Sequence, residues 1–551
     1  MPVYNRPDVY VEEISTLPPS VAEVSTAIPA FIGYTEYDSL TLQPTRITSF
    51  LEFTTLFGGA APVPFTADTT GELPLINIDA QDTMRDHKLY YALDLYFKNG
   101  GSDCYIVSLG AFKTKAKSDF EKGIAALITE DEPTLIILSE ATTLTDSNEY
   151  YSLCQQALTQ CAGMQDRFCI LDVLPPADNT TTATDAAILQ FRGGIGNQNM
   201  SYGAAYFPYL YTTLNYVYNE DNVTIAATGT APKAVAGGIT VTSKKAVSNT
   251  DKPRVTIAVP TGDGAASDIS FAAAANGLTI TAPPNKTAQN VYDAWNSNQK
   301  ITQLKADFDM AATNGAAKVV AATANFTATT SPSASLTSIK QTQPTLYNAI
   351  KQEMGKFKLV LPPAAAIAGV YALTDRTRGV WKAPANVSLN AVIGPTIKIS
   401  NQAQDRLNVD ATTGKSINAI RSFTGKGTLV WGARTLDGSS NEWRYVPVRR
   451  LFIMIEESAK KASYFAVFEP NDASTWLKVK GTIESFLYSL WQQGALAGST
   501  PKAAYYVNIG LGITMTQQDI LEGRMIVEIG IAAVRPAEFL ILRFSHKLQE
   551  A

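Results

Sequence analysis

The segment 134–138, TLIIL, is a short run dominated by apolar residues, of the kind that forms a fully buried β-strand. Similar runs lie on either side of it, CYIVSL at 104–109 and FCILDVL at 168–174. Segments with the apolar spacing of helices separate these runs, at 81–98, 117–129 and 148–162. Helices that alternate with short apolar strands are typical of an α/β layer. The sequence therefore predicts a mainly parallel sheet between about residues 80 and 210.

The C-terminal third also mixes helices and strands, so the fold class predicted for the whole chain is α/β with α+β parts. Helices are expected at 345–356, 363–375, 447–461 and 474–493, and strands at 428–431, 525–531 and 539–544. Glu456 stands four residues before Lys460, and Glu457 four residues before Lys461, in the order that favours ion pairs along a helix. We expect that face to be solvated or paired with charge elsewhere.

Between 212 and 345 the composition shifts to Ala, Thr, Gly and Ser, and Arg254 is the single arginine. Short strand-like segments such as 239–242 and 255–259 alternate with turn residues, and 288–296 has helical spacing. These features predict a small β-rich module inserted into the α/β material. The weak charge would also suit a disordered segment, and that alternative stays open here.

Residues 1 to about 30 have the character of an arm. Val9 and Val11 alternate with polar neighbours as in a strand, and the prolines at 18–19 then interrupt regular structure. If extended, 14–28 would span about 45–50 Å, enough to reach a neighbouring molecule. An unpaired strand invites another chain to pair with it, although each terminal strand could also pair within its own molecule.

The composition argues against several classes of function. The 551 residues carry 45 Lys+Arg and 50 Asp+Glu, a net charge of −5 without a basic stretch, which disfavours a dedicated nucleic-acid binder. His87 and His546 are the only histidines, so the commonest general base and zinc ligand are scarce. We expect His87 to lie solvated on the polar side of a helix.

Other residues that suggest chemistry have simpler interpretations. Gly414-Lys415-Ser416 resembles the end of a phosphate-binding loop, but position 409 is Val where that motif needs glycine. Aspartates flank the predicted strands and are expected to be helix caps or solvated residues, namely Asp103, Asp166 and Asp172. The cysteines lie in apolar segments and are expected to be buried free thiols of a reducing compartment, namely Cys104, Cys154, Cys161 and Cys169.

The sequence shows no secretion or membrane signal. The N-terminus carries prolines and acidic residues in place of a cationic start and an apolar run, so we expect the chain to stay in the cytosol or to leave it by another route. The best candidate for a membrane span, the uncharged stretch 359–373, carries two prolines and is shorter than the roughly 20 residues that cross a bilayer.

The C-terminal third resembles contractile phage tail sheath proteins. The segment 362–386, PPAAAIAGVYALTDRTRGVWKAPAN, is similar to a signature of that family. Further similar segments are RRL at 449–451, FAVFEPN at 465–471, LWQQGALAG at 490–498 and VRPAEF at 534–539, together with 4–14 and 30–33 near the N-terminus. The resemblance does not extend over 212–345.

The resemblance implies a structural subunit without a cofactor and without enzyme activity. Sheath subunits of this family polymerise as stacked hexameric rings around an inner tube, and contraction drives the tube through a target envelope. The implied partners are neighbouring copies, the inner tube protein, and baseplate and tail terminator or cap proteins, with no nucleic acid and no membrane insertion. Assembly is expected in the cytoplasm, as part of a phage tail or of a phage-tail-like injection system.

The family also implies that both terminal arms add strands to neighbouring subunits. By position the linking residues are Val9, Tyr10, Val11 and Ile14 in the first arm, and Phe539, Leu540, Ile541 and Arg543 in the second. Contact with the tube has to be reversible, and ion pairs screened by salt are reversible. Candidate tube contacts are therefore the lysines of two C-terminal helices, Lys460, Lys461, Lys478 and Lys480.

The predicted domains are an arm at 1–30, an α/β part at 31–211, the outward insertion at 212–345, a C-terminal core at 346–524 and an arm at 525–551. Two other functions remain as alternatives. An α/β enzyme with a β-rich accessory domain would need a set of convergent titratable residues. A capsid or surface protein would explain the uncharged insertion but not the C-terminal signature.

Overall fold

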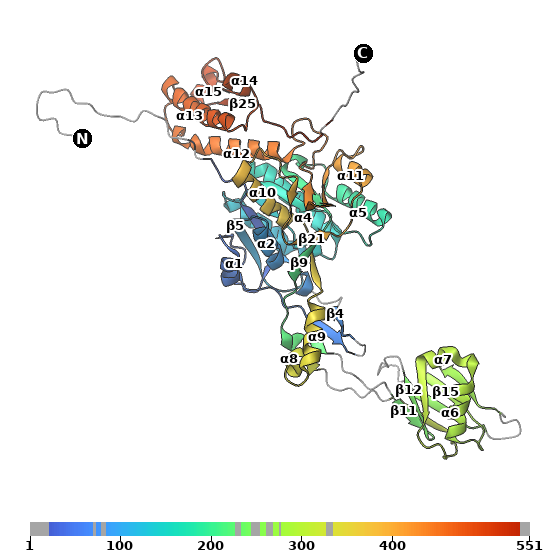
Figure 1. Ribbon diagram of the computed structural model, residues 1–551. Helices are drawn as coiled ribbons and strands as arrows, with labels where there is room; N and C mark the ends of the chain where they lie inside the picture. The colour runs from blue at the N-terminus through green and yellow to red at the C-terminus, as the bar shows by residue number, and fades with distance from the viewer. Residues whose placement is uncertain are drawn as a thin grey trace, which may run out of the picture. The chain divides into compact units, whose positions relative to one another are not determined.

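The computed structural model describes residues 21, 23–69, 73–78, 84–225, 233–243, 254–260, 268–274, 277–326, 334–539 and 541. The chain forms two compact units, coloured by residue number in Figure 1. The first unit comprises Met1–Val63, Asp82–Val217 and Phe357–Ala551, and the second comprises Pro64–Gln81 and Tyr218–Lys356.

The first unit is organised around a nine-stranded sheet, in the order β2-β5-β1-β6-β7-β8-β22-β23-β20. Its five central strands are parallel, which confirms the predicted parallel sheet: β5 (Cys104–Ala111), β1 (Pro29–Thr35), β6 (Leu135–Ile137), β7 (Phe168–Asp172) and β8 (Gly203–Phe207). Strand β22 (Ile417–Phe423) continues the parallel part. The edge strands β2 (Thr45–Ile47), β23 (Gly427–Trp431) and β20 (Val387–Ser388) pair antiparallel with their neighbours.

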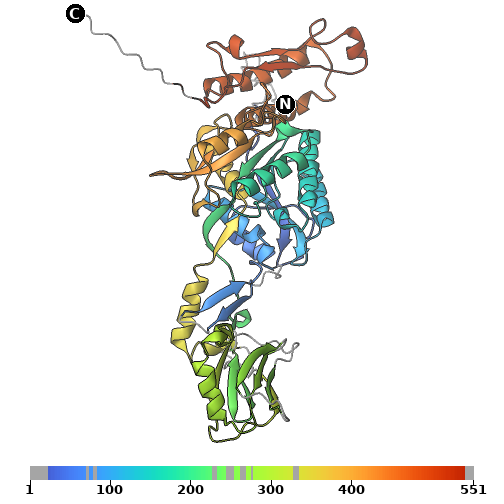
Figure 2. The same ribbon diagram turned by 90° about the vertical axis from the view of Figure 1, so that its right-hand side faces the viewer.

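Helices cover both faces of this sheet (Figure 2). One face packs on α1 (Phe50–Phe57), α2 (Leu89–Lys98) and α10 (Ala364–Arg378), and the other on α3 (Lys117–Ala126), α4 (Ser147–Met164) and α5 (Thr181–Gly194). Alternation along β1 divides the two cores, because Phe31 points to the first while Ala30 and Ile32 point to the second. The four cysteines are buried free thiols, as predicted, and burial raises the pKa of each one.

The helix expected at 81–98 begins only at Leu89, after a 3-10 turn at Met84–Asp86. The Glu140 carboxylate accepts a hydrogen bond from the Leu89 amide, which sets the start of the helix. A smaller antiparallel sheet joins β19 (Lys358–Leu361), β9 (Leu210–Asn215) and β21 (Val392–Pro395), followed by α11 (Asn401–Asn408).

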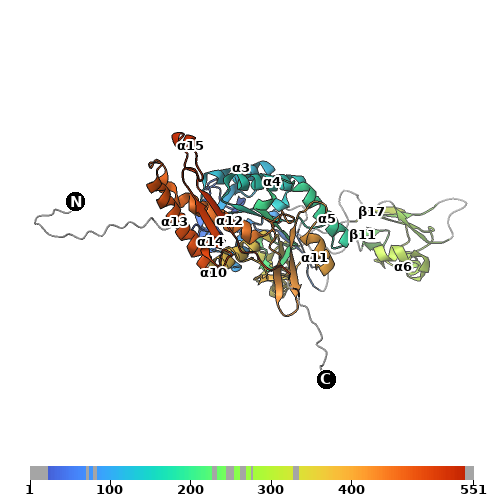
Figure 3. The same ribbon diagram turned by 90° about the horizontal axis from the view of Figure 1, so that it is seen from above.

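The C-terminal part of the first unit has its own core around α12 (Val446–Ala462) and α13 (Ala473–Gln492), which lie side by side when seen from above (Figure 3). Pro447 stands in the first turn of α12, as predicted. The chain continues through α14 (Pro501–Ala504), β24 (Tyr505–Asn508), α15 (Gln517–Leu521) and β25 (Glu528–Ile531). Residues of α12 belong both to this core and to a core of the large sheet.

The described residues of the second unit form three small sheets. The first joins β18 (Ala334–Ser335), β10 (Thr224–Ile225), β3 (Phe65–Asp68) and β4 (Leu75–Ile78). The other two join β11 (Lys233–Ala236), β12 (Ile239–Ser243) and β16 (Phe308–Ala312), and β14 (Ser270–Ala274), β15 (Gly277–Thr281), β13 (Arg254–Ala258) and β17 (Ala322–Asn325). The helices are α6 (Ala288–Ser297), α7 (Thr302–Asp307), α8 (Leu336–Ile339) and α9 (Pro344–Met354).

The observed units divide the chain differently from the expected domains. Strand β9, placed in the insertion by composition, pairs with β19 in the first unit. Helix α9, placed in the C-terminal core, belongs to the second unit, where the Tyr347 hydroxyl donates to Glu220 Oε1 at 2.7 Å. Strand β3 joins the second unit because it pairs with β10, more than 150 residues later in the chain.

Candidate assembly interface

A pair of buried charges anchors the chain where the N-terminal segment enters the first unit. The Arg450 guanidinium binds Asp375 at 3.1 and 2.5 Å, with side chains only 3% and 7% exposed. Arg450 also donates to the Thr26 carbonyl at 2.6 Å, and the Thr26 hydroxyl donates to Asp375 Oδ2 at 2.6 Å. The backbone at Thr26 is therefore held by a charge-assisted network.

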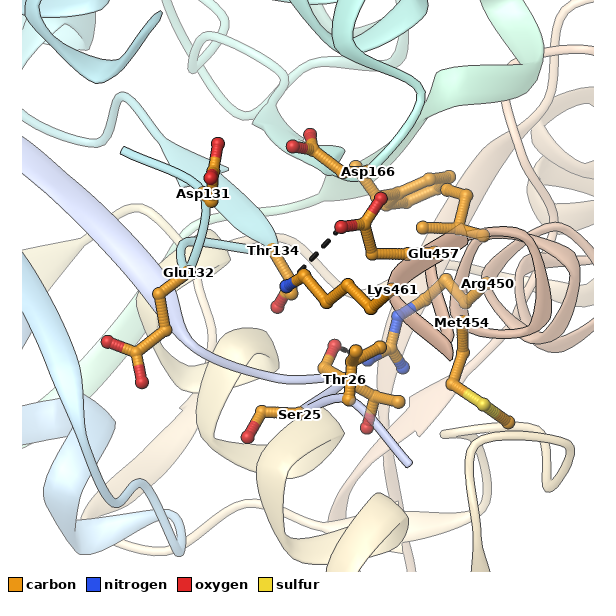
Figure 4. Close-up of a pocket in the computed structure, with 13 residues that line it drawn as sticks. Ser25, Thr26, Asp131, Glu132, Thr134, Asp166, Arg450, Met454, Glu457 and Lys461 are labelled. Carbon is orange, nitrogen blue, oxygen red and sulfur yellow. Dashed lines mark hydrogen bonds and ion pairs between the residues drawn. The ribbon is translucent and has the colours of Figure 1, made fainter. Parts of the chain in front are cut away.

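Two further bonds fix the same segment. The Val24 amide donates to Ser458 Oγ of α12 at 3.2 Å, and the Ile28 amide donates to Thr134 Oγ1 at 2.9 Å. Figure 4 shows Thr26 and Arg450 together at a small cavity of about 50 Å³, next to the ion pair of Glu457 and Lys461. Residues 24–28 are thus part of the folded unit, and the predicted linking residues at 9–14 lie outside the described residues.

A second anchor holds the segment that leaves β25. The Arg434 guanidinium binds Glu538 through Nε and Nη2, at 2.9 and 2.6 Å, with side chains 4% and 23% exposed. Asn408 Nδ2 and the Tyr445 hydroxyl also donate to the Glu538 carboxylate, at 2.9 and 3.2 Å. Burial alone would raise the pKa of Glu538, but the hydrogen bonds from Arg434 and Asn408 hold it below its usual range.

The anchored part of this segment ends at Glu538. Arg535 donates to the Asn441 carbonyl at 2.7 Å, whereas Phe539 and Ile541 are largely exposed. Phe539 and Ile541 have no assigned strand, and Leu540 and Arg543 lie outside the described residues. The expectation of a strand at 539–544 therefore stays a prediction.

Strands β24 and β25 form a sheet of their own, with Tyr505 opposite Ile531 and Asn508 opposite Glu528. The described part of the chain adds no third strand to this pair. A two-stranded sheet is marginal by itself, and its outer edges present unpaired backbone groups. Large apolar side chains are exposed in the same C-terminal part of the unit, at Tyr464, Val467, Phe468, Leu477, Tyr488, Tyr506, Leu511, Ile513, Leu521 and Ile526.

Comparison with known proteins identifies the family of this architecture. The family model of the phage tail sheath C-terminal domain matches residues 439–547. The tail sheath protein of Vibrio phage KVP40 (isolate Vibrio parahaemolyticus/Japan/Matsuzaki/1991) is 28% identical over 138 residues, 25% of this chain and 20% of that protein. The aligned region thus spans about a fifth of the length of that relative.

Two solved structures resemble the chain over almost its whole length. The sheath complex of PVC, an extracellular contractile injection system, in the contracted state is 26% identical with a TM-score of 0.55, covering 100% of this chain and 99% of that chain. The helical sheath of the anti-feeding prophage (AFP) in the contracted state is 27% identical with a TM-score of 0.56, covering 99% and 100%. Over almost its whole length the chain is therefore similar to contractile tail sheath proteins. The resemblance expected from 362–386 and the other C-terminal segments is confirmed.

In this chain, the lysines considered for tube contact have different environments. Lys460 and Lys461 both pair with Glu457 at 3.3 Å. Glu456 pairs with Arg449 at 3.5 Å, so this part of the helix face is paired with charge elsewhere, which is one of the two expected outcomes. Lys480 lies 3.7 Å from Glu484, and Lys478 is exposed on α13.

The parallel strands of the first unit follow the order β5-β1-β6-β7-β8, which is the flavodoxin-like order. Folds of this order bind ligands at the carboxyl ends of the strands that flank the reversal, here β1 and β6. In this protein Glu140, which is fully buried, fills that place, and a Cβ added to Gly33 would lie 2.4 Å from Glu140 Oε2. The crevice that would hold a ligand is therefore occupied by the protein's own side chains.

The residues around this edge correct one sequence expectation and bear out another. His87 was expected to be solvated, but it is buried and lies 3.0 Å from Glu140 Oε1, because Glu140, just after β6, supplies a carboxylate partner. Asp172 is fully buried, and burial raises its pKa to about 7. Asp172 does serve as a cap, since it accepts from the Ala364 amide at the start of α10 at 2.7 Å.

Two other residues that the sequence offered as possible functional groups form buried contacts within the fold. The Lys415 ammonium is buried and donates to the Arg192 carbonyl, which leaves it unavailable to a phosphate. Asp166 forms a buried pair with Arg167 at 2.6 Å. Within the described ranges, His, Cys, Asp and Glu form no group suited to a metal ion, and no helix is long and apolar enough to span a bilayer.

Proposed function

We propose that this chain is the repeating subunit of a contractile sheath, which polymerises as stacked hexameric rings around an inner tube and contracts to drive the tube through a target envelope. The observation that carries the proposal is the pair of anchored segments. The folded unit anchors the chain at Val24 near its N-terminal end and at Glu538 near its C-terminal end. We propose that residues 1–20 and 542–551 reach other subunits.

The sheet of β24 and β25 is suited to receive such segments. Both outer edges can accept an added strand, and main-chain hydrogen bonds depend little on which side chains the added strand carries. The exposed apolar residues of the same region support an interface, because monomeric proteins rarely expose so many large apolar side chains close in sequence. We propose that the segments at 9–14 and 539–544 of neighbouring copies occupy these edges.

Contraction needs a source of free energy. The place where this sheet topology would bind a nucleotide-like ligand is filled by Glu140. We therefore propose that the energy is stored at assembly, in an extended sheath that is metastable relative to the contracted one and is held by a kinetic barrier. Strand-paired arms would keep the subunits linked while their bodies rotate.

The tube contact is assigned to Lys478 and Lys480 in preference to Lys460 and Lys461. The latter two share Glu457, whereas Lys478 is exposed on α13 and Lys480 has a longer and weaker contact. Assembly with baseplate and cap proteins, assembly in the cytoplasm and the lack of enzyme activity belong to the same proposal.

Electron microscopy of the purified chain tests the proposal. The wild type should form tubes or stacked rings, and deletion of residues 1–16 should leave folded subunits that do not form long sheaths. A sharper pair of variants is Val9→Pro with Val11→Pro against Val9→Ala with Val11→Ala, because only proline removes the backbone N–H that pairs a strand. Normal sheaths from the proline variant would show that this arm is not the link.

The tube contact is tested separately by co-assembly with the inner tube protein. Lys478→Glu with Lys480→Glu should abolish assembly around the tube while leaving sheath polymers intact, with Lys502→Glu as a control on another exposed lysine of the same region. Wild-type co-assembly by the double variant would rule out this contact.

A further inference from the structure

Helix α12 connects the two anchors of the terminal segments. Arg450 and Ser458, both on α12, hold Thr26 and Val24. The chain runs past the helix in the opposite direction, since the lower-numbered Val24 lies at the higher-numbered helix position. The N-terminal segment therefore leaves the unit toward the C-terminal end of α12.

The C-terminal segment is fixed at the other end of the same helix. Tyr445 is the residue that precedes α12, and its hydroxyl donates to Glu538. Arg434 is tied to that position through the backbone, because residues 434 and 445 form a β-bridge and the Val446 amide donates to the Ala433 carbonyl at 3.0 Å. Movement of Glu538 relative to the start of α12 would therefore break the Arg434 contacts.

The two attachment points have a fixed spacing along the helix. From Tyr445 to Ser458 there are 13 steps (458 − 445), which at 1.5 Å per residue gives about 20 Å. The helix between them is held by packing in two cores, through Val446 and Ile453 in one and Leu451, Met454 and Ile455 in the other. A helix packed on two sides does not stretch or bend easily.

We propose that α12 acts as a strut that sets the distance between the exit points of the two arms, with Arg450 and Arg434 as the positioning residues. This inference rests on the proposed sheath function. Each subunit would then present its two links to the neighbours at a constant separation, in the extended and the contracted sheath alike. Movement during contraction is confined to the segments before Val24 and after Glu538.

The chain offers a closely matched control for the first anchor. Arg449 and Arg450 are adjacent in α12 and both are buried, but Arg449 binds Tyr202 and Glu456, and no hydrogen bond or ion pair joins it to the described residues of the N-terminal segment. Arg450→Lys keeps the charge and loses the forked geometry that reaches both Asp375 and Thr26. Arg449→Lys is the control, because it makes the same chemical change at the neighbouring residue of α12.

Hydrogen exchange of the soluble subunit reports each anchor directly. Arg450→Lys should raise amide exchange at 23–28 by about ten-fold or more, with little change at 533–539, and Arg449→Lys should leave 23–28 at the wild-type rate. Glu538→Gln should do the reverse, raising exchange at 533–539 only. Glu528→Gln is its control, because the Glu528 carboxylate accepts a hydrogen bond from the exposed Tyr506 hydroxyl and does not hold the segment after β25. Equal exchange in each variant and its control would overturn the assignment of the anchors.

Sheath images test the strut itself. If sheaths form, the combined Arg450→Lys and Glu538→Gln variant should give shorter polymers with a variable helical repeat, whereas the two control substitutions together should keep the wild-type repeat. A wild-type repeat in the anchor variant would overturn the inference. Should Arg450→Lys reduce folding, Thr26→Val replaces it, since it removes only the hydroxyl donor to Asp375.

If the wild-type chain forms no sheath at all, the proposed function fails instead. The exchange measurements on the soluble subunit would then still decide whether the anchors exist.

Discussion

The two units of this protein have cores of different chemistry. The first encloses charged side chains, among them Glu140, Asp166, Arg167, Asp172, Arg192, Lys415, Arg434, Arg449 and Arg450. In the second unit, Ser243 is the one polar side chain that is buried among the described residues, and the rest of that core is apolar. Breaking a buried charge pair is costly, whereas an apolar core tolerates many sequences of similar volume. We infer that the core sequence of the first unit is constrained by the geometry of its buried charge pairs, whereas the core sequence of the second unit is free to vary.

The largest expected effect comes from removing most of the second unit. Ile225 of β10 lies directly opposite Ala334 of β18 in an antiparallel pair, so an Asn-Gly turn should replace residues 226–333. The shortened protein should lose the thermal transition of the module and keep both the unfolding midpoint of the first unit and sheath formation. Calorimetry and electron microscopy check the two parts, and loss of sheaths in a folded variant would contradict the division of roles.

The next effect concerns a buried charge pair of the first unit. Arg167 binds Asp166 and donates to the carbonyls of Leu127 and Glu130 at 2.8 and 2.7 Å. Arg167→Met should lower the free energy of unfolding by about 3–5 kcal/mol, because it leaves the Asp166 carboxylate buried without its partner. The control is Arg406→Met, which removes an exposed pair with Asp185 and should cost about 1 kcal/mol or less in denaturant titrations. Similar losses of unfolding free energy in the two variants would mean that burial does not strengthen the Arg167 pair.

A pH-dependent effect follows from Asp172. Its pKa is raised from 3.8 to about 7 by burial, so the folded state binds a proton that the unfolded state releases between these values. The stability from this group is complete below about pH 4 and is lost as the pH rises through 7. Between pH 5 and 8 the wild type should lose about 3 kcal/mol more than Asp172→Asn. Parallel stability curves for the two proteins would refute this linkage.

The smallest effect is expected at the surface of the second unit. Lys351 Nζ lies 2.8 Å from Glu220 Oε1, in a pair whose side chains are partly exposed. Glu220→Gln should change the stability of that unit by less than about 1 kcal/mol, and added salt should reduce the difference further. A loss as large as that of Arg167→Met would show that the second unit also depends on charge.

Local features of the fold could be predicted from the sequence. The apolar runs at 104–109, 134–138 and 168–174 became parallel strands, and Pro447 marked the start of α12, because these signals depend on neighbouring residues. The unit boundaries could not be predicted, since β3 and β10 find each other only in the folded chain. Composition changes at 212, whereas the folded boundary lies after β9.

The two anchors could not be predicted either, because their contacts join residues that are far apart in the chain. Arg450 and Asp375 are 75 residues apart, and Arg434 and Glu538 are 104 apart, so no local pattern connects them. A partial signal existed, because Arg449-Arg450 and the segment 534–539 were among the family-like segments. The exposure of His87 was predicted wrongly because its partner Glu140 comes from the loop after β6, 53 residues later in the chain, and a helical pattern alone gives no sign of that partner.

Glu140, seated against Gly33 at the carboxyl edge of the parallel sheet, also affects how the subunit responds to load. Folds with an open crevice at this edge can close around a ligand, and such closure is a soft mode of deformation. Here that mode is blocked, so a force applied through the arms has no cleft to compress at this point. The first unit should therefore resist compression at this edge of its large sheet, and a load on that unit should be transmitted without closing a cleft there.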